Sequence, residues 1–407
     1  VSLIYLIQMN RIGLTPHITF HSPRVKNPTE IEIGDVVVWV RTQLIVFEII
    51  SREPGASSNL SSFTRRIGEK RDQLVQDFKF FDSLEHDISL VNEDETEILF
   101  LNEYFVPQGF MGLVIVDIGS EELTLHKGTV EKCLLNDFPT NIIHYSGLQK
   151  VIHELDTVSD VYFYFLDRYR FLPFLFKNHT GLVVKLTESF ESNLLGFYKM
   201  NENSFPEEKF NLESFPTYWE TYQTDFSQQI ANRDIENDDS YVIDRIIGFI
   251  LDARTPDNDE TIFAWELATL ARRQRAGYLT ETVVDALARL QEGNEKRFFA
   301  YFNDYTKCWI LFLFVYGDST DSFRGELDRL LRLKTIYEAV MNDFGYSTFG
   351  YGFRKSELIT QNPLFDEMAF DIQDVENLEA VSAKEIAEAK TLFGHKRSID
   401  IKEFPVE

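Results

Sequence analysis

The chain has 407 residues and a formal net charge of −26, and 44% of its residues are hydrophobic and 14% aromatic. This composition argues against a disordered chain, and the negative balance argues against general adhesion to nucleic acid or to an anionic membrane. The two cysteines, Cys133 and Cys308, form neither a disulfide framework nor a zinc pattern and suit a reducing compartment. We therefore expect a cytoplasmic protein of two or three folded domains, without a signal peptide or a membrane segment.

The first part of the chain, residues 1–172, alternates predicted strands and helices. The apolar runs 31–40 and 44–50 are separated by only three residues, so they predict an antiparallel hairpin. A loop follows, and then an amphipathic helix that begins at Ser57 or Ser58 and ends near Phe81. Further strands are predicted at 18–20, 97–104, 113–117 and 141–145, and further helices from about Ser146 and from Thr157 or Ser159. Strands mixed with packing helices predict an α/β to α+β fold with a mixed sheet flanked by helices.

The rest of the chain predicts an irregular connection over 173–235 and a second α+β domain over 236–407. The connection is polar, aromatic and punctuated by proline. In the second domain we expect helices at 240–253, 260–275, 280–291 and 322–344 and strands at 298–302, 308–315 and 346–353. Residues 271–290 faintly resemble a helix-turn-helix, with an αα-hairpin that carries solvated arginines as the alternative. We find no internal sequence repeat, and we expect this half to bind a protein partner, to form a homo-oligomer or to regulate the first domain.

Two carboxylates stand in the otherwise apolar hairpin of the first part. If the turn centres on Thr42, Asp35 falls opposite Ile49, whereas a shift of one residue puts Asp35 and Glu48 on the same face. Buried neighbouring carboxylates repel each other and are costly unless a metal ion or a base neutralises them. Oxygen ligands of this kind suit Mg²⁺ or Mn²⁺, so the pair is a candidate metal site. The alternative is that Asp35, after Gly34, simply opens a strand.

An acid on one strand, a short hairpin, an acid on the next strand and then a helix resemble the PD-(D/E)xK restriction-endonuclease-like superfamily. Asp35 and Glu48 match the two acids of the motif, whereas Ile50 stands where the motif has its lysine. The resemblance covers residues 18–172 at most. It implies that the acids hold Mg²⁺ and that a lysine contacts the phosphate and the attacking water.

The helix after the hairpin offers replacements for the missing lysine. Many relatives carry a Lys, Arg or Gln on this helix that faces the site, and the matching residues here are Arg66, Lys70 and Gln73. Arg66, Lys70 and Arg71 also belong to a basic cluster that we expect to contact nucleic acid, with a solvated surface as the alternative. Loss of one preorganised charge at a catalytic site typically lowers the rate by about 10²–10³. Three interpretations of Ile50 stay open: Lys70 takes over, the enzyme is inactivated, or Ile50 is an engineered replacement.

The resemblance implies a Mg²⁺-dependent nuclease that hydrolyses phosphodiester bonds in DNA, or its inactivated form, with bacterial anti-phage defence as a possible setting. The candidate site comprises Asp35, Glu48, Ile50, Lys70 and Gln73. Because the chain is so acidic, we expect its targeting to DNA to depend on a partner or an assembly. The alternative is a non-catalytic scaffold or interaction subunit that retains the nuclease fold. An acidic mimic of DNA would carry its carboxylates in surface rows, and the strongly apolar core pattern of this chain disfavours it.

Overall fold

The chain divides into two compact units. Unit 1 comprises residues up to 244 together with 254–273, and unit 2 comprises 245–253 and 274–401. The computed structural model describes residues 19–394 with gaps, of which the longest are 52–59, 83–88, 101–108, 132–137, 253–260 and 356–364. Both units mix α and β structure, so the expected α/β to α+β class is confirmed. Among the described helices, none has the length and apolar character that a membrane span requires.

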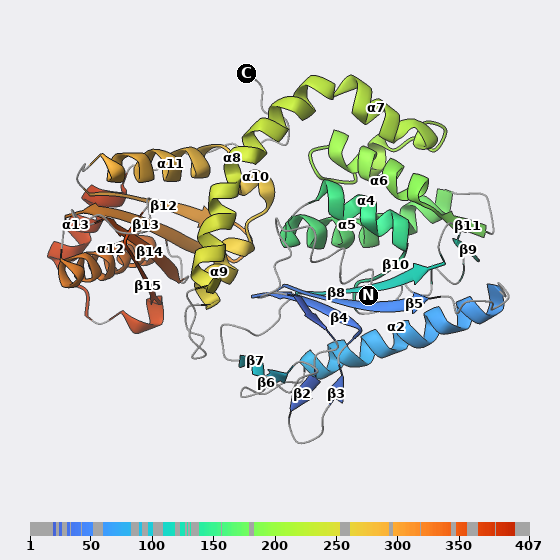
Figure 1. The fold of residues 1–407 in the computed structure, drawn as a ribbon, viewed down its shortest axis with the longest axis horizontal. Coiled ribbons are helices and arrows are strands. Elements are labelled where there is room, and N and C mark those ends of the chain that lie inside the picture. The colour runs from blue at the N-terminus through green and yellow to red at the C-terminus, as the bar shows by residue number, and fades with distance from the viewer. Residues whose placement is uncertain are drawn as a thin grey trace. The chain divides into compact units, whose positions relative to one another are not determined.

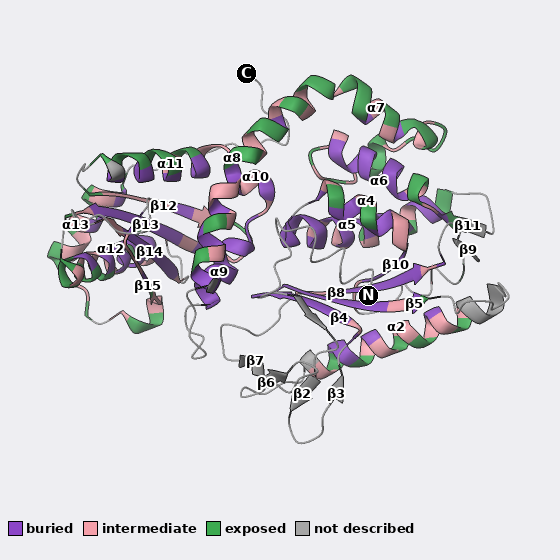
Figure 2. Ribbon diagram, in the orientation of Figure 1, coloured by how far each residue is buried: buried purple, intermediate pink, exposed green. Residues whose placement is uncertain are grey.

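The core of unit 1 is a five-stranded mixed sheet in the order β1-β4-β5-β8-β10 (Figure 1). The first three strands in this order, β1 (Thr19–His21), β4 (Val36–Val40) and β5 (Gln43–Ser51), are antiparallel neighbours. The strand β8 (Gly109–Asp117) runs parallel to β5, and β10 (Thr140–His144) runs parallel to β8. Every residue of β4 and β10 is buried (Figure 2), so both faces of this sheet are covered.

Helices cover the two faces. On one face lies α2 (Leu60–Asp82), whose Leu74 and Phe78 approach Gly112 of β8 so closely that a Cβ there would lie 3.1 Å and 3.3 Å from them. On the other face lie α4 (Tyr145–Glu154) and α5 (Val158–Asn178), where Asn141 Nδ2 of β10 donates a hydrogen bond of 3.0 Å to Phe165 O. Unit 1 is therefore built as helix, sheet and helix layers around apolar strands.

The predicted strand 31–40 is interrupted at Gly34. This glycine has φ +59°, and a Cβ on it would lie 2.5 Å from Val46 Cγ1, so the position requires glycine. The run is therefore split into β3 (Ile31–Glu32) and β4. The remaining strands of unit 1 form two smaller sheets: β3, β2 (Arg24–Lys26), β6 (Ser89–Val91) and β7 (Glu97–Phe100) in one, and β11 (Val183–Leu186) with β9 (Leu123–His126) in the other.

Residues 173–235 are not the irregular connection that we expected. The helix α5 continues through Pro173 to Asn178, and α6 (Glu188–Met200), α7 (Tyr218–Asp225) and the start of α8 (Ser227–Asp252) follow, with short 3₁₀ turns at Glu207–Lys209 and Phe215–Thr217. Thr187 caps α6 by accepting a hydrogen bond of 3.1 Å from Phe190 N, and Glu191 forms a fully buried ion pair with Arg168 of α5. These helices were not predicted because they lack a regular apolar stripe in the sequence. Buried polar pairs and aromatic packing stabilise them instead. The helix α9 (Thr261–Ala268) belongs to unit 1, and the chain passes from unit 1 to unit 2 within α10 (Arg272–Arg275).

Unit 2 has a four-stranded sheet in the order β12-β13-β14-β15. Its strands are β12 (Arg297–Asn303), β13 (Cys308–Tyr316), β14 (Thr348–Lys355) and β15 (Glu367–Gln373), and only the central pair β13–β14 is parallel. Besides the last turns of α8, which belong to unit 2, its helices are α11 (Tyr278–Gln291), α12 (Thr320–Met341) and α13 (Ala383–Phe393), with a 3₁₀ turn at Val375–Asn377. The predicted strands at 298–302, 308–315 and 346–353 and the helices at 280–291 and 322–344 are thus confirmed to within a few residues.

Candidate active site

The pairing of β4 with β5 places the two hairpin carboxylates opposite each other. The observed register pairs Val40 with Gln43 and Val36 with Phe47, so the next pair outward is Asp35 and Glu48. Asp35 is fixed there because its N–H donates to Phe47 O (2.9 Å) and its Oδ2 accepts from Ile49 N–H (2.7 Å). The hairpin therefore has the register shifted by one residue from a turn centred on Thr42, which is the register that the acid pair needs.

Lys70 joins the two acids from the neighbouring helix. It lies in the middle of α2, and its Nζ is 2.5 Å from Glu48 Oε2 and 3.5 Å from Asp35 Oδ2. Glu48 is completely buried, whereas Asp35 and Lys70 are partly exposed. Three side chains thus meet at the N-terminal end of β4: Asp35 just before β4, Glu48 on β5 and Lys70 on α2.

Burial dominates the electrostatics of this site. It raises the pKa of Glu48 to about 8, helped by the charge of Asp35 and opposed by the hydrogen bond and charge of Lys70. Burial also acts to lower the pKa of Lys70, but the hydrogen bond and charge of Glu48 outweigh it, so this pKa is raised. Glu48 Oε1 is buried and has no hydrogen-bond partner among the residues that the structure describes. A buried acceptor without a partner costs about 1–3 kcal/mol, so this oxygen is a position where a ligand would be stabilising.

The other predicted site residues are spread around this centre. Ile50 is fully buried two residues after Glu48 on β5, where successive side chains alternate faces, so it lies on the same face as Glu48. Gln73 is half-buried on α2, three residues beyond Lys70. Arg66 Nη1 donates to Ser51 O at 3.1 Å, which ties α2 to the end of β5.

The basic cluster is partly neutralised by its own helix. Arg71 forms an ion pair with Asp72, and Arg65 forms an exposed pair with Glu69 at 3.4 Å. Lys70 points to the acids. Arg66, which donates to Ser51 O, is therefore the member of this cluster without a carboxylate partner among the described residues.

The donor set fits a magnesium site with few protein ligands. Asp35 and Glu48 supply carboxylate oxygens, and Glu48 Oε1 is the buried acceptor that a cation would satisfy. Within the described ranges no group of three or more His, Cys, Asp and Glu side chains is placed to hold a metal ion. Mg²⁺ commonly takes one or two protein carboxylates and completes its shell with water and substrate phosphate, so two carboxylates are sufficient.

Searches against models of protein families, curated proteins and solved structures found no match to this chain.

Proposed function

We propose that the chain is a Mg²⁺-dependent nuclease of the PD-(D/E)xK restriction-endonuclease-like type, with DNA as its substrate and its site at Asp35, Glu48 and Lys70. The observation that carries the proposal is the contact of one lysine with both hairpin carboxylates. The hairpin is followed by α2, as the resemblance expects, and after the short strands β6 and β7 the chain forms β8, which runs parallel to β5.

In this proposal Lys70 replaces the lysine that the motif has at position 50. Ile50 is buried and apolar, so it cannot supply a charge, whereas the ammonium group of Lys70 already lies between the acids. A lysine at this point would donate hydrogen bonds to a phosphate oxygen and orient the attacking water.

Each side chain has a separate role in this arrangement. Asp35 and Glu48 would hold Mg²⁺, and the ion, when bound, would polarise the scissile phosphate and lower the pKa of a bound water. The hydrogen bond from Ile49 N–H keeps Asp35 in place. Glu48 lies on the face of β5 that α2 covers, so its carboxylate points toward α2. Arg66, one turn before Lys70, would contact the phosphate backbone, and Gln73, nearly one turn after it, would contribute a polar group.

The net charge of −26 supports targeting through a partner or an assembly, since the chain as a whole repels nucleic acid. We also propose that the protein acts in anti-phage defence in the cytoplasm. In the same proposal, unit 2 forms a homo-oligomer or binds a protein partner.

A second candidate function, a non-catalytic subunit that retains the fold, is favoured by one observation. Ile50 occupies the motif position of the lysine, and Lys70 forms an internal ion pair that neutralises the acids without any ligand. A scaffold descended from a nuclease would be stabilised in this way.

Plasmid cleavage in Mg²⁺ or Mn²⁺ tests the proposal. We expect Asp35→Asn and Glu48→Gln to lower cleavage by about 10²–10³, and Lys70→Met to lower it by about 10². Glu69→Gln is the matched control, because Glu69 is an exposed carboxylate on the same helix that pairs only with Arg65 among the described residues. This control should cut like the unchanged chain.

The Ile50→Lys variant separates the two functions. Cleavage that appears only in Ile50→Lys would identify an inactivated nuclease. Absence of cleavage in every version, together with absence of Mg²⁺ binding by calorimetry, would reject the nuclease and favour the scaffold.

A further inference from the structure

The turn between β4 and β5 sets the geometry of the candidate active site. Val40 pairs with Gln43, so two residues make the turn, and this register brings Asp35 beside Glu48. With a turn of three residues the strands would slip by one position. Since side chains alternate faces along a strand, Asp35 and Glu48 would then point to opposite faces of the sheet. The acid pair therefore depends on a two-residue turn.

The residues of this turn do not favour it by themselves. Two-residue hairpin turns are most often Asn-Gly, Asp-Gly or Gly-Gly, because the common type requires a positive φ at both central residues. The chain has Arg41 and Thr42 here, and Arg41 adopts φ 49°, which is costly for a residue with a Cβ. Such a conformation persists only where the surrounding structure holds it. Contacts from outside the hairpin must therefore hold this turn.

A helix from far along the chain supplies these contacts. Arg41 is buried and forms an ion pair with Glu266 of α9, which is completely buried. Before the turn, Trp39 Nε1 donates to Arg41 O at 2.7 Å, and the ring of Trp39 lies 6.3 Å from the ring of Trp265 of α9. The backbone and the side chain of Arg41 are thus both held, the side chain by a charge that lies more than 200 residues away in the sequence.

The strand after the turn is attached to the same part of the chain through α5. Ser159 Oγ lies 3.1 Å from Oε1 of Gln43, the first residue of β5, and donates to Thr269 O at 2.5 Å just after α9. All three residues are completely buried. One residue further along α5, Asp160 Oδ2 accepts from Arg272 N–H at 2.8 Å. The segment that carries Glu266 is therefore anchored on α5 at two points.

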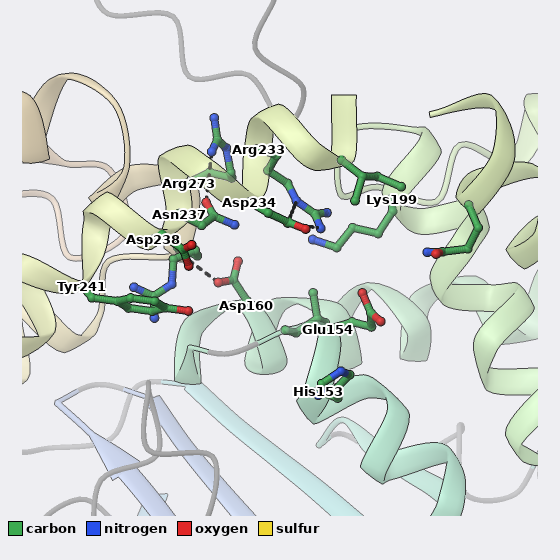
Figure 3. A pocket seen from close by; sticks show the side chains of 14 residues that line it. His153, Glu154, Asp160, Lys199, Arg233, Asp234, Asn237, Asp238, Tyr241 and Arg273 are labelled. Carbon is green, nitrogen blue, oxygen red and sulfur yellow. Dashed lines mark hydrogen bonds and ion pairs between the residues drawn. The ribbon is translucent and has the colours of Figure 1, made fainter. Parts of the chain in front are cut away.

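A polar pocket of about 370 Å³ lies at the second of these points (Figure 3). Its lining comes from α4, α5, α6, α7, α8 and α10 and includes Asp160 and Arg272. The two arginines of α10 in this lining are paired with carboxylates of α8, since Arg272 lies 2.6 Å from Asp244 and Arg273 lies 2.7 Å from Glu236. These ion pairs attach the end of the segment to α8 as well as to α5.

We propose that Glu266 is a positioning residue of the candidate active site. Its ion pair holds Arg41 at a positive φ, and the resulting turn keeps β4 and β5 in the register that the acid pair needs. Removing the charge of Glu266 leaves Arg41 buried with less negative charge beside it and no longer offsets the cost of its backbone, so a longer turn and a slipped register become favoured. The inference rests on the proposed function for its catalytic consequence, whereas the register can be measured without cleavage.

A disulfide between the two strands reports the register. Val37 pairs with Val46, and residues directly opposite on antiparallel strands have Cα atoms about 4.5–5.5 Å apart, within the range that a disulfide needs. After a slip of one residue the two side chains would lie on opposite faces and could not be linked. In the full chain with Val37→Cys and Val46→Cys we expect the disulfide to form under mild oxidation. Adding Glu266→Gln should slow its formation at least about tenfold, as measured by mass spectrometry of the linked peptides.

Two further variants separate the register from general stability. Arg41→Asn with Thr42→Gly, the turn variant, has the sequence that closes two-residue turns by itself, so adding Glu266→Gln to it should change the rate of disulfide formation by less than about twofold. Glu191→Gln is the matched control, because it removes the charge from another fully buried ion pair of unit 1, that of Arg168 and Glu191. It should lower the Tm and leave the disulfide unaffected.

The outcomes decide between a positioning role and a merely stabilising one. An unchanged rate of disulfide formation in Glu266→Gln would overturn the proposal, and so would a loss that the turn variant does not restore. If Glu266→Gln fails to fold in the original turn, its combination with the turn variant gives the decision in the same way. Plasmid cleavage, measured without the added cysteines, should fall at least about tenfold in Glu266→Gln and recover in the combination. If the disulfide results hold but the unchanged chain cuts no plasmid, the nuclease proposal fails and the control of the register by Glu266 stands.

Discussion

Units 1 and 2 build the same local arrangement and fill it differently. In unit 1 the antiparallel hairpin β4–β5 is followed by α2 and, after β6 and β7, by β8, which runs parallel to β5. In unit 2 the antiparallel hairpin β12–β13 is followed by α12 and by β14, which runs parallel to β13. The structure therefore repeats an arrangement for which the sequence shows no repeat.

The two arrangements can be matched residue by residue. The strands β5 and β13 each have nine residues, and Glu48 and Leu313 are both the sixth. Each faces the following helix, since Glu48 contacts Lys70 of α2 and Leu313 belongs to the apolar cluster of α12. The glycine on the parallel strand is also matched, with Gly112 paired to Val46, the fourth residue of β5, and Gly350 paired to Leu311, the fourth of β13.

The same matching identifies the counterparts of Asp35 and Lys70. Phe298 pairs with Leu313 across the hairpin of unit 2, as Asp35 lies opposite Glu48 in unit 1. Leu74 of α2 lies over Gly112 and Leu331 of α12 lies over Gly350, so Lys70, four residues before Leu74, corresponds to Leu327. The Asp, Glu and Lys of unit 1 are therefore Phe, Leu and Leu in unit 2.

The comparison shows that this arrangement of strands and helix does not need a buried carboxylate. In unit 2 the three positions belong to a continuous apolar core, in which Leu313 and Leu327 are buried and Phe298 packs against them. A buried acid at the same point of unit 1 raises its own pKa and leaves one oxygen without a partner among the described residues. A cost of this kind, in a position where leucine would serve, supports the interpretation of Asp35, Glu48 and Lys70 as functional residues.

The largest effect should follow from placing a carboxylate in unit 2. Leu313→Glu buries an acid with Leu327 and Phe298 around it and no lysine, so it should lower the free energy of unfolding by more than about 4 kcal/mol. Hydrogen exchange should show that β13 and β14 lose protection. Leu313→Met, the control, should cost less than about 1.5 kcal/mol. A stable Leu313→Glu variant would contradict the claim that Lys70 is what makes Glu48 tolerable.

The fold was largely predictable from patterns of apolar residues, because strands such as β5 and β13 bury nearly every side chain and their composition shows it. The acid pair was predictable for the opposite reason, since Glu48 interrupts such a run. The register was left between two possibilities, because the sequence does not show that Arg41 adopts φ 49° and closes the turn after two residues.

Two features lay beyond the sequence for physical reasons. The helices α6 and α7 depend on long-range partners such as the Arg168–Glu191 ion pair, which no local pattern reveals. The polar pocket gathers residues from α4 to α10, and its arginines at 272 and 273 were expected to be solvated or to contact DNA. Arg272 is instead buried and paired with Asp244.

An intermediate effect should follow from removing the lysine of unit 1. Lys70→Met leaves Glu48 buried without its cation and should lower the free energy of unfolding by about 3 kcal/mol. The double variant Glu48→Leu with Lys70→Met gives two of the three positions apolar side chains, as in unit 2, and should unfold within about 1 kcal/mol of the unchanged chain. Urea unfolding of the two variants measures the difference. If the double variant is as unstable as the single one, the equivalence between Glu48 and Leu313 fails.

The smallest effect should be the dependence of stability on pH that Glu48 causes in unit 1. Unit 2 has Leu313 at the matching position, which does not titrate. The pKa of Glu48 is about 8 in the folded chain and 4.5 for an ordinary glutamate, so between these values the folded state binds more protons than the unfolded state. The stability of the unchanged chain should therefore fall, relative to Glu48→Gln, as the pH rises from 5.5 to 7.5. Since one pKa unit corresponds to about 1.4 kcal/mol, the change over this interval is at most about 2.7 kcal/mol.

Urea unfolding of both proteins at several pH values measures this difference, in which all other titrating groups cancel. Leu313→Met is the control, because it alters the matching position of unit 2 without a titrating group and should follow the unchanged chain at every pH. A difference between the unchanged chain and Glu48→Gln that stays constant with pH would mean that Lys70 holds Glu48 ionised throughout. Glu48 and Lys70 would then form an ion pair at every pH tested. Glu48 would have a structural role at this position, as Leu313 has in unit 2, and its pKa would not be raised.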